Sequence, residues 1–84
     1  MVMWYVYIIR CRDGSLYTGS TTDVVRRLKE HNAKKGGHYT CVRTPVKLEY
    51  QEKYSTRSEA LKREAQIKRC SRQKKLAIFK HNIV

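Results

Sequence analysis

The sequence predicts an α+β fold, a small three-stranded antiparallel sheet flanked by helices in the order ββα-β-αα. Two segments rich in aromatic and β-branched residues flank a glycine-containing turn near the N-terminus, and a third such segment lies in mid-chain. Polar helix-capping residues precede the remaining periodic segments. With four glycines and one proline in 84 residues, we expect residues 1–84 to form one ordered domain.

The first two strands are predicted at residues 3–10 and Ser15–Gly19, as a hairpin. A two-residue Asp-Gly loop would place Tyr7 and Tyr17 on opposite faces of the sheet. A three-residue loop with Gly14 in the left-handed conformation would place both phenols on one face. The sequence leaves both registers open, although glycine at the third loop position suits the second.

A helix is predicted over residues 23–34, because Thr21-Thr22-Asp23 supplies capping residues and Lys35-Gly36-Gly37 ends it. Its narrow apolar stripe consists of Val24, Val25 and Leu28. Arg27 and His31 lie four residues apart and form one polar edge beside this stripe. That edge is either simply solvated or functional.

The second half of the chain begins with a polar and aromatic connection over residues 38–45. A third strand, Val46–Tyr54, follows, with Val46, Leu48 and Tyr50 alternating against polar residues. A capping box at Thr56–Glu59 starts a helix that runs to about Arg69. Ser71 caps a last helix, which carries Leu76, Ala77 and Phe79.

In the helix after the capping box, Glu64 falls in the middle of the apolar stripe formed by Ala60, Leu61 and Ile67. A carboxylate at such a position is costly unless it is paired or binds a metal. Two readings follow: a structural ion pair with a lysine or arginine, or a metal ligand. Lys68 lies on the same face as Glu64 and is its expected neighbour.

Net charge is the strongest global signal. Nineteen Lys and Arg against seven Asp and Glu give +12, which attracts polyanions such as nucleic acid. Three widely spaced cysteines without a C-x-x-C pair predict free thiols and an intracellular chain. The N-terminal stretch lacks the features of a secretory signal, and nothing reaches the length of a membrane span. We expect a cytoplasmic protein, nucleoid-associated if bacterial, with no membrane partner.

These pieces resemble the GIY-YIG endonuclease family, in its compact single-domain, UPF0213-like branch. The stretch YVYI at 5–8 stands where the family has G-I-Y, and YTG at 17–19 stands for Y-I-G. Arg27, His31 and the helix with Glu64 follow in the family's order. The ordered set is specific, although each motif alone is weak.

The resemblance extends over most of the chain, including GGHYTCVRTPVKL at 36–48. Tyr5 replaces the glycine of G-I-Y, and Thr18 replaces the isoleucine of Y-I-G. Neither position supplies a reactive group in the family, so the implied chemistry is retained.

The resemblance implies metal-dependent hydrolysis of phosphodiester bonds in DNA. The implied catalytic residues are Tyr7, Tyr17, Arg27, His31 and Glu64. Tyr7 would be the general base or would orient the attacking water, and Glu64 would hold one Mg²⁺ or Mn²⁺. A free phenol has a pKa of about 10, so Tyr7 would need a nearby cation to lower its pKa, or a relay through Tyr17, His31 or Lys68.

Four residues are implied nucleic-acid contacts: Gly19, Arg27, Arg43 and Lys68. Arg27 would hold a nonbridging phosphate oxygen, and Gly19 would permit close approach of the backbone to the scissile phosphate. Branched and single-stranded DNA are the candidate substrates, in repair or recombination. Many family nucleases carry a second DNA-selecting domain, so a protein partner is a candidate for substrate selection here. A non-catalytic nucleic-acid-binding module or an accessory subunit with the nuclease fold remains the alternative function.

Overall fold

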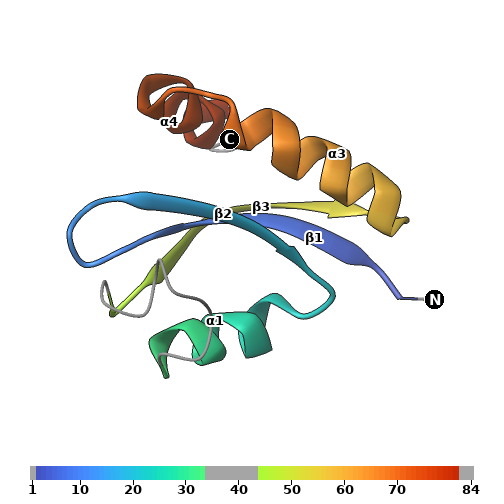
Figure 1. Cartoon of the computed structure of the whole chain (residues 1–84), viewed down its shortest axis with the longest axis horizontal. Coiled ribbons are helices and arrows are strands. Elements are labelled where there is room, and N and C mark those ends of the chain that lie inside the picture. The colour runs from blue at the N-terminus through green and yellow to red at the C-terminus, as the bar shows by residue number, and fades with distance from the viewer. Residues whose placement is uncertain (1, 34–43, 82–84) are drawn as a thin grey trace.

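The structure is a computed structural model that describes residues 2–33 and 44–81. Within these ranges the elements are β1 (Trp4–Arg10), β2 (Leu16–Thr21), α1 (Val24–Asn32), β3 (Lys47–Tyr54), α3 (Arg57–Lys68) and α4 (Arg72–His81). The strands form one antiparallel sheet in the order β2-β1-β3. Helix α1 covers one face, called the α1 face below, and α3 and α4 cover the other, called the α3 face (Figure 1). The predicted α+β class and element order are confirmed.

The hairpin adopts the three-residue loop, one of the two registers that the sequence leaves open. Gly14 has a φ of 86°, in the left-handed region that favours glycine. Tyr7 pairs with Gly19, and Ile9 pairs with Tyr17. Paired residues of antiparallel strands point to the same face, so Tyr7 and Tyr17 both lie on the α1 face.

The central strand β1 is buried on both sides and supplies two separate cores. On the α3 face, Val6 and Ile8 pack with Ala60 and Ile67 of α3. On the α1 face the buried cluster consists of Tyr7, Ile9, Cys11 and Val46, with Tyr17 and Leu28 packed against it. Strict alternation along β1 therefore decides which side chains reach each face.

Strand β3 departs from the predicted alternation. Its register with β1 shifts between Ile8, which faces Tyr50, and Ile9, which faces Leu48. The extra residue is a bulge, and it reverses the side to which the following side chains point. Val46 consequently packs on the α1 face and Tyr50 on the α3 face. The expectation that Val46, Leu48 and Tyr50 share one face is wrong.

The helix starts follow the predicted capping residues. The Asp23 carboxylate accepts a hydrogen bond from a backbone N–H of the first turn of α1 at 3.0 Å. The Thr56 hydroxyl accepts one from the Glu59 N–H at 3.2 Å. Two predicted apolar positions are not buried: Val25 is 66% exposed and Leu61 is 41% exposed. The buried stripes of α1 and α3 are therefore narrower than the predicted apolar stripes.

Asn32 ties the end of α1 to the start of β3. Its side chain accepts a hydrogen bond from the Val46 N–H at 2.7 Å and donates one to the Val46 carbonyl at 3.3 Å. This contact fixes the C-terminal turn of α1 over the sheet, one residue after His31. Among the residues that the structure describes, no helix is long and apolar enough to cross a membrane.

Candidate active site

Tyr7 lies in the central strand, and its ring lies over the neighbouring strand at Gly19. A Cβ atom on residue 19 would lie 2.5 Å from Tyr7 Oη and 2.7 Å from Cζ. Any side chain at residue 19 would displace the Tyr7 ring, and Tyr7 is only 2% exposed. Gly19 thus lets the Tyr7 hydroxyl reach β2, the edge strand of the sheet. The predicted contact of Gly19 with phosphate stays a prediction; the structure adds this packing reason for the glycine.

His31 is the partner of Tyr7. It is completely buried, and its Nε2 lies 3.1 Å from Tyr7 Oη, within hydrogen-bond distance. The rings of Tyr17 and His31 meet edge to face with their centroids 5.3 Å apart. The solvated reading of this helix edge is therefore wrong for His31. The last turn of α1 holds an imidazole between two phenols.

Arg27 lies one helical turn before His31, with its side chain 29% exposed. Its guanidinium forms an ion pair with Glu30 at 3.1 Å. It also donates a hydrogen bond to Tyr7. Desolvation lowers the pKa of Arg27, but the hydrogen bonds to Glu30 and to Tyr7 outweigh it and raise the pKa overall. Arg27 thus brings positive charge to the same phenol that contacts His31.

Burial decides the protonation of the phenol and the imidazole. Desolvation raises the pKa of Tyr7 above its usual value, and it outweighs the opposing hydrogen bond and charge of Arg27. Desolvation, followed by the charge of Arg27, lowers the pKa of His31. Near neutral pH both side chains are therefore uncharged. Arg27 is the nearby cation that Tyr7 was expected to need, but its charge does not lower the pKa of Tyr7 overall. The contact between Tyr7 and His31 instead fits the alternative expectation, a proton relay through His31.

Glu64 and Lys68 reach this cluster from the other side of the sheet. The Glu64 side chain is 15% exposed, and its Oε2 lies 2.7 Å from Lys68 Nζ. Negative charge on Glu64 is a minor contributor to the raised pKa of Tyr7. Charge on Tyr17 likewise adds to the raised pKa of Lys68, for which the hydrogen bond to Glu64 is the largest cause. The pair on α3 is thus electrostatically coupled to both tyrosines.

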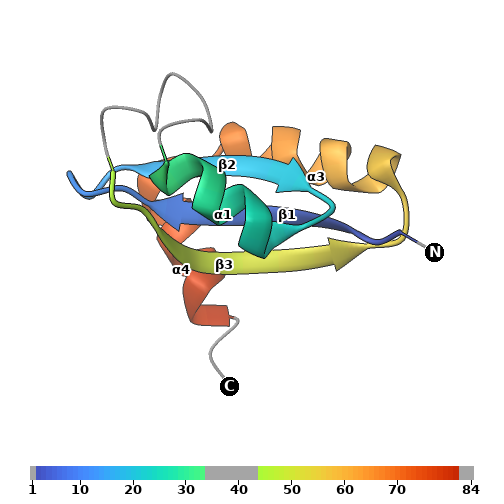
Figure 2. The same ribbon diagram turned by 90° about the horizontal axis from the view of Figure 1, so that it is seen from below.

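This coupling across the sheet follows from the positions of the elements. Helix α3 runs along the β2 side of the sheet, behind the edge strand in Figure 2. Tyr7 extends over β2 from the α1 face, through the space that Gly19 leaves. Side chains from opposite faces can therefore approach each other at the β2 edge. In the interior of the sheet, the backbone of the strands would separate them.

The donor set suits one hard cation. The described ranges contain no group of three or more His, Cys, Asp or Glu side chains that could hold a metal ion. Mg²⁺ keeps several of its waters and is commonly bound through one or two carboxylates. A single partly buried carboxylate, Glu64, fits one such ion and is too few for a two-metal centre.

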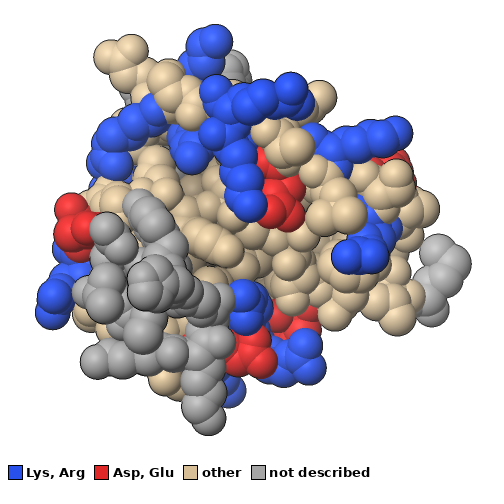
Figure 3. Space-filling view, in the orientation of Figure 1, with Lys and Arg blue, Asp and Glu red and all other residues tan. Residues whose placement is uncertain are grey.

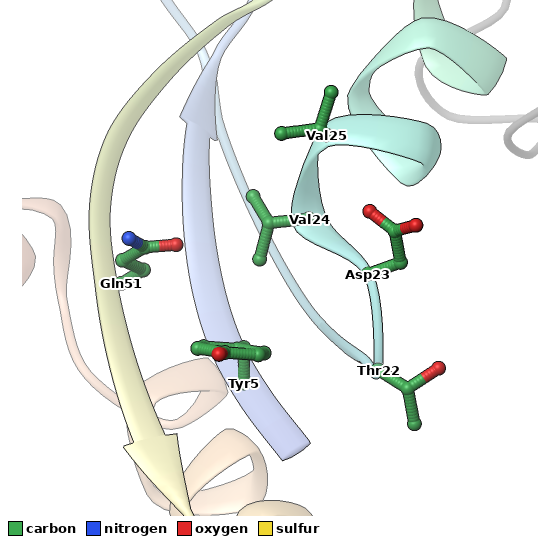
Figure 4. Close-up of a pocket in the computed structure, with 6 residues that line it drawn as sticks. All are labelled: Tyr5, Thr22, Asp23, Val24, Val25 and Gln51. Atoms are coloured by element: carbon green, nitrogen blue, oxygen red, sulfur yellow. The ribbon is translucent and has the colours of Figure 1, made fainter. Parts of the chain in front are cut away.

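Of the predicted site residues, Tyr7, Tyr17, Arg27 and His31 form one cluster on the α1 face, and Glu64 and Lys68 lie at the β2 edge beside it. Arg43 lies outside the described residues. A separate hollow of about 280 Å³ opens at the start of α1 and is lined by Tyr5, Thr22, Asp23, Val24, Val25 and Gln51 (Figure 4). None of the predicted catalytic residues lines it.

The sequence reasoning missed a second polar cluster, on the α3 face. Arg63 of α3 binds Glu52 through Nε at 2.8 Å and Nη2 at 3.0 Å. The hydroxyls of Tyr50 and Tyr54 donate to the same carboxylate. A signal was present: Glu52 stands between two tyrosines at spacing two, so the three side chains share one face of a strand.

Comparison with known proteins identifies the family of this chain. Residues 3–77 match the GIY-YIG catalytic domain, so the chain belongs to the GIY-YIG family. Relatives within that family include UPF0213 proteins. It is 58% identical over 76 residues to a UPF0213 protein of Staphylococcus aureus, covering 90% of this chain and 93% of the relative. It is 55% identical over 75 residues to one of Staphylococcus saprophyticus, covering 89% and 92%.

Two solved structures share the fold. The solution NMR structure of a UPF0213 protein from Bacillus halodurans is 45% identical, with a TM-score of 0.59, and covers 90% of this chain and 81% of that one. A protein from E. faecalis, also solved by NMR, is 40% identical, with a TM-score of 0.64, and covers 98% and 88%. The predicted family resemblance is confirmed.

Proposed function

We propose that this chain is a divalent-metal-dependent endonuclease that hydrolyses phosphodiester bonds in DNA. One observation carries the proposal: the Tyr7 hydroxyl is buried against an uncharged His31 beside Arg27. A sheet core does not need these groups, because aliphatic side chains would fill the space without the cost of burying polar atoms. Buried titratable groups with shifted pKa values are typical of catalytic sites.

Tyr7 and His31 form the proton path in this mechanism. As the attacking water loses a proton to Tyr7 Oη, the phenolic proton passes to His31 Nε2. This requires the tautomer with hydrogen on Nδ1, so that Nε2 has a free lone pair. The lowered pKa of His31 supports the proposal, because it keeps the imidazole able to accept a proton near neutral pH. The phenol never has to carry a full negative charge.

Charge at the phosphate is handled by Arg27 and Glu64. The guanidinium of Arg27, beside Tyr7, would hold a nonbridging oxygen. Glu64 would hold one Mg²⁺ or Mn²⁺ with its waters, and the ion would stabilise charge as it develops on the phosphate. Tyr17 packs against His31 and keeps the imidazole oriented toward Tyr7. Arg43 and Lys68 would contact the flanking backbone.

The surface charge fits this substrate. Basic side chains gather over α3 and α4 on the face drawn in Figure 3, and acidic ones are few there. Nineteen basic against seven acidic residues would steer DNA to the site, and binding would weaken steeply with salt. We infer a cytoplasmic, nucleoid-associated protein that acts on branched or single-stranded DNA in repair or recombination, with a protein partner for substrate selection.

The Glu64–Lys68 ion pair favours a second candidate function. Lys68 lies 2.7 Å from the Glu64 carboxylate and neutralises it, so Glu64 could serve only as one half of a structural ion pair. In that case the chain would be a non-catalytic nucleic-acid-binding module, or an accessory subunit, with the nuclease fold. DNA binding without cleavage would be its signature.

Plasmid nicking in Mg²⁺ and in EDTA tests the proposal. Glu64→Gln and Tyr7→Phe should each lower the Mg²⁺-dependent nicking rate by about a hundredfold or more while the proteins stay folded. Tyr54→Phe is the matched control, since it also removes a phenol from the sheet, but on the α3 face. Undiminished nicking in both site variants would exclude this mechanism. DNA binding by the wild type without nicking would support the second function.

A further inference from the structure

The Glu64–Lys68 pair is asymmetric. The Glu64 side chain is 15% exposed, whereas that of Lys68 is 53% exposed and reaches its partner from the last residue of α3. The carboxylate is thus held in place by packing, while the long lysine side chain can leave at little cost. A pair with one largely exposed partner typically adds little to stability.

Beside Lys68 lies a hollow between the edge strand and the last helix, with a volume of about 270 Å³. Its lining consists of Leu16, Tyr17, Thr18, Lys68 and Lys75. Tyr17 also touches His31, so the hollow shares one residue with the candidate active site. Thr18 is 3% exposed, and its hydroxyl has no hydrogen-bond partner among the residues that the structure describes.

The lining favours one kind of ligand. The apolar walls of Leu16 and Tyr17 suit a sugar or base, and the ammonium groups of Lys68 and Lys75 are complementary to the phosphate attached to it. A strand that places its scissile phosphate near Tyr7 and Arg27 would run past this opening. The chemistry therefore matches a backbone phosphate next to the scissile one.

We propose that this hollow binds a flanking backbone phosphate and that Lys68 is shared between it and Glu64. In the free protein Lys68 forms an ion pair with the Glu64 carboxylate. A divalent cation on Glu64 would repel the ammonium group, which then turns to the phosphate held with Lys75. The metal ion and the nucleic acid should therefore bind with positive coupling. The metal ion releases Lys68 for the phosphate, and the phosphate draws Lys68 away from Glu64. This inference rests on the proposed function, because it uses Glu64 as the metal ligand.

The metal side of the exchange is tested by Mn²⁺ binding, followed by EPR of the free ion. Lys68→Met should bind Mn²⁺ about fivefold more tightly than the wild type. Lys62→Met is the matched control: it removes the same charge from the same helix, outside this hollow, and should change the affinity less than about twofold. Lys68→Arg keeps the charge and should resemble the wild type.

The phosphate side is tested with a fluorescent single-stranded oligonucleotide in EDTA. Lys75→Met should weaken binding about threefold to tenfold and reduce the salt dependence by about one counterion. Lys74→Met, an exposed neighbour on α4 outside the hollow, is the control and should have a smaller effect. In Ca²⁺, the wild type should bind the oligonucleotide more tightly than in EDTA, and Lys68→Met should lose much of this gain.

The outcomes separate the two proposals. If Glu64→Gln leaves Mn²⁺ binding unchanged, Glu64 is no metal ligand, and both proposals fail. If Glu64→Gln abolishes Mn²⁺ binding while Lys68→Met resembles Lys62→Met, the shared lysine is wrong and the nuclease stands. Equal effects of Lys75→Met and Lys74→Met would overturn the hollow as a phosphate site.

Discussion

The two faces of the sheet use the same residue types for different ends. On the α1 face, Tyr7 contacts His31 and Arg27. On the α3 face, Tyr50 and Tyr54 donate to the Glu52 carboxylate, which also receives both nitrogens of the Arg63 fork. Each face thus pairs tyrosine with arginine, but the α3 face adds a carboxylate where the α1 face adds an imidazole.

That one difference decides what each cluster can do. Burial alone would raise the pKa of Glu52, yet the hydrogen bonds from Arg63, Tyr50 and Tyr54 lower it, so the carboxylate stays charged. Desolvation and the bond to Glu52 raise the pKa of Tyr50 and of Tyr54 to about 12. These phenols are fixed as donors to an acceptor that holds its charge. His31, being uncharged, can take up a proton, and under the proposed function this distinguishes a reactive cluster from a structural one.

The largest expected effects come from a matched pair of substitutions, Arg27→Met and Arg63→Met. The two side chains are 29% and 31% exposed, so the change in buried surface is similar. Arg27→Met should lower the nicking rate about a hundredfold and cost less than about 1 kcal/mol of unfolding free energy. Arg63→Met should cost about 2 kcal/mol and leave the rate per folded molecule unchanged, because it strands the Glu52 carboxylate.

Urea unfolding and plasmid nicking on the same preparations would measure both quantities. If Arg63→Met lowers the rate as much as Arg27→Met does, the α3 face takes part in catalysis and the contrast between the faces is lost. Loss of DNA affinity equal to the loss of rate in Arg27→Met would make that residue a binding group only.

Gly19→Ala tests how the α1 face is assembled. The new Cβ would lie 2.5 Å from Tyr7 Oη, so the buried ring must move, at a cost of about 1–3 kcal/mol. The hydroxyl should leave His31, and nicking should fall with stability. A double-mutant cycle sharpens the test: in a Tyr7→Leu background, Gly19→Ala should cost little, because the ring it meets is gone. Additive costs would show that the glycine serves the backbone instead.

The sequence predicted the order of elements well because capping residues and strand patterns act locally. Asp23 and Thr56 cap their helices as expected, since each needs only a backbone N–H three residues away. The bulge in β3 was not predictable, because it depends on how the strand meets β1 in three dimensions. It is this bulge that brings Tyr50 to the α3 face.

The site shows the same limit. Glu64 was predictable as a candidate because a carboxylate within an apolar stripe is visible in one dimension, and Tyr7 and His31 were predictable from the order of the family's motifs. The raised pKa of Tyr7 was not predictable, because burial outweighs the charge of Arg27 there. The role of Gly19 as the gap through which Tyr7 reaches the sheet edge also needs the pairing register, which the sequence left open.

The pH dependence of stability should report His31. Its pKa is lowered in the folded protein, mainly by desolvation, so the unfolded chain binds the proton more readily. The free energy of unfolding should therefore fall as the pH drops below about 6.5, the ordinary value for histidine. His31→Gln should show a shallower fall in urea titrations between pH 7 and 5. The other two histidines are present in both proteins, so the difference isolates His31; identical slopes would mean that the imidazole titrates as if exposed.

The smallest expected effect is on the α3 face, at Tyr54. Tyr54→Phe removes one donor at 2.6 Å from Glu52 and leaves the Arg63 fork and Tyr50 in place. Because the carboxylate keeps three of its four hydrogen bonds, the cost should be about 1 kcal/mol, measured by urea unfolding. Nicking per folded molecule should be unchanged, since this phenol has no base to which it could pass its proton. If Tyr54→Phe lowered the nicking rate nearly as much as Tyr7→Phe does, proton transfer would not depend on His31. The distinction between the two faces would then rest on Arg27 alone.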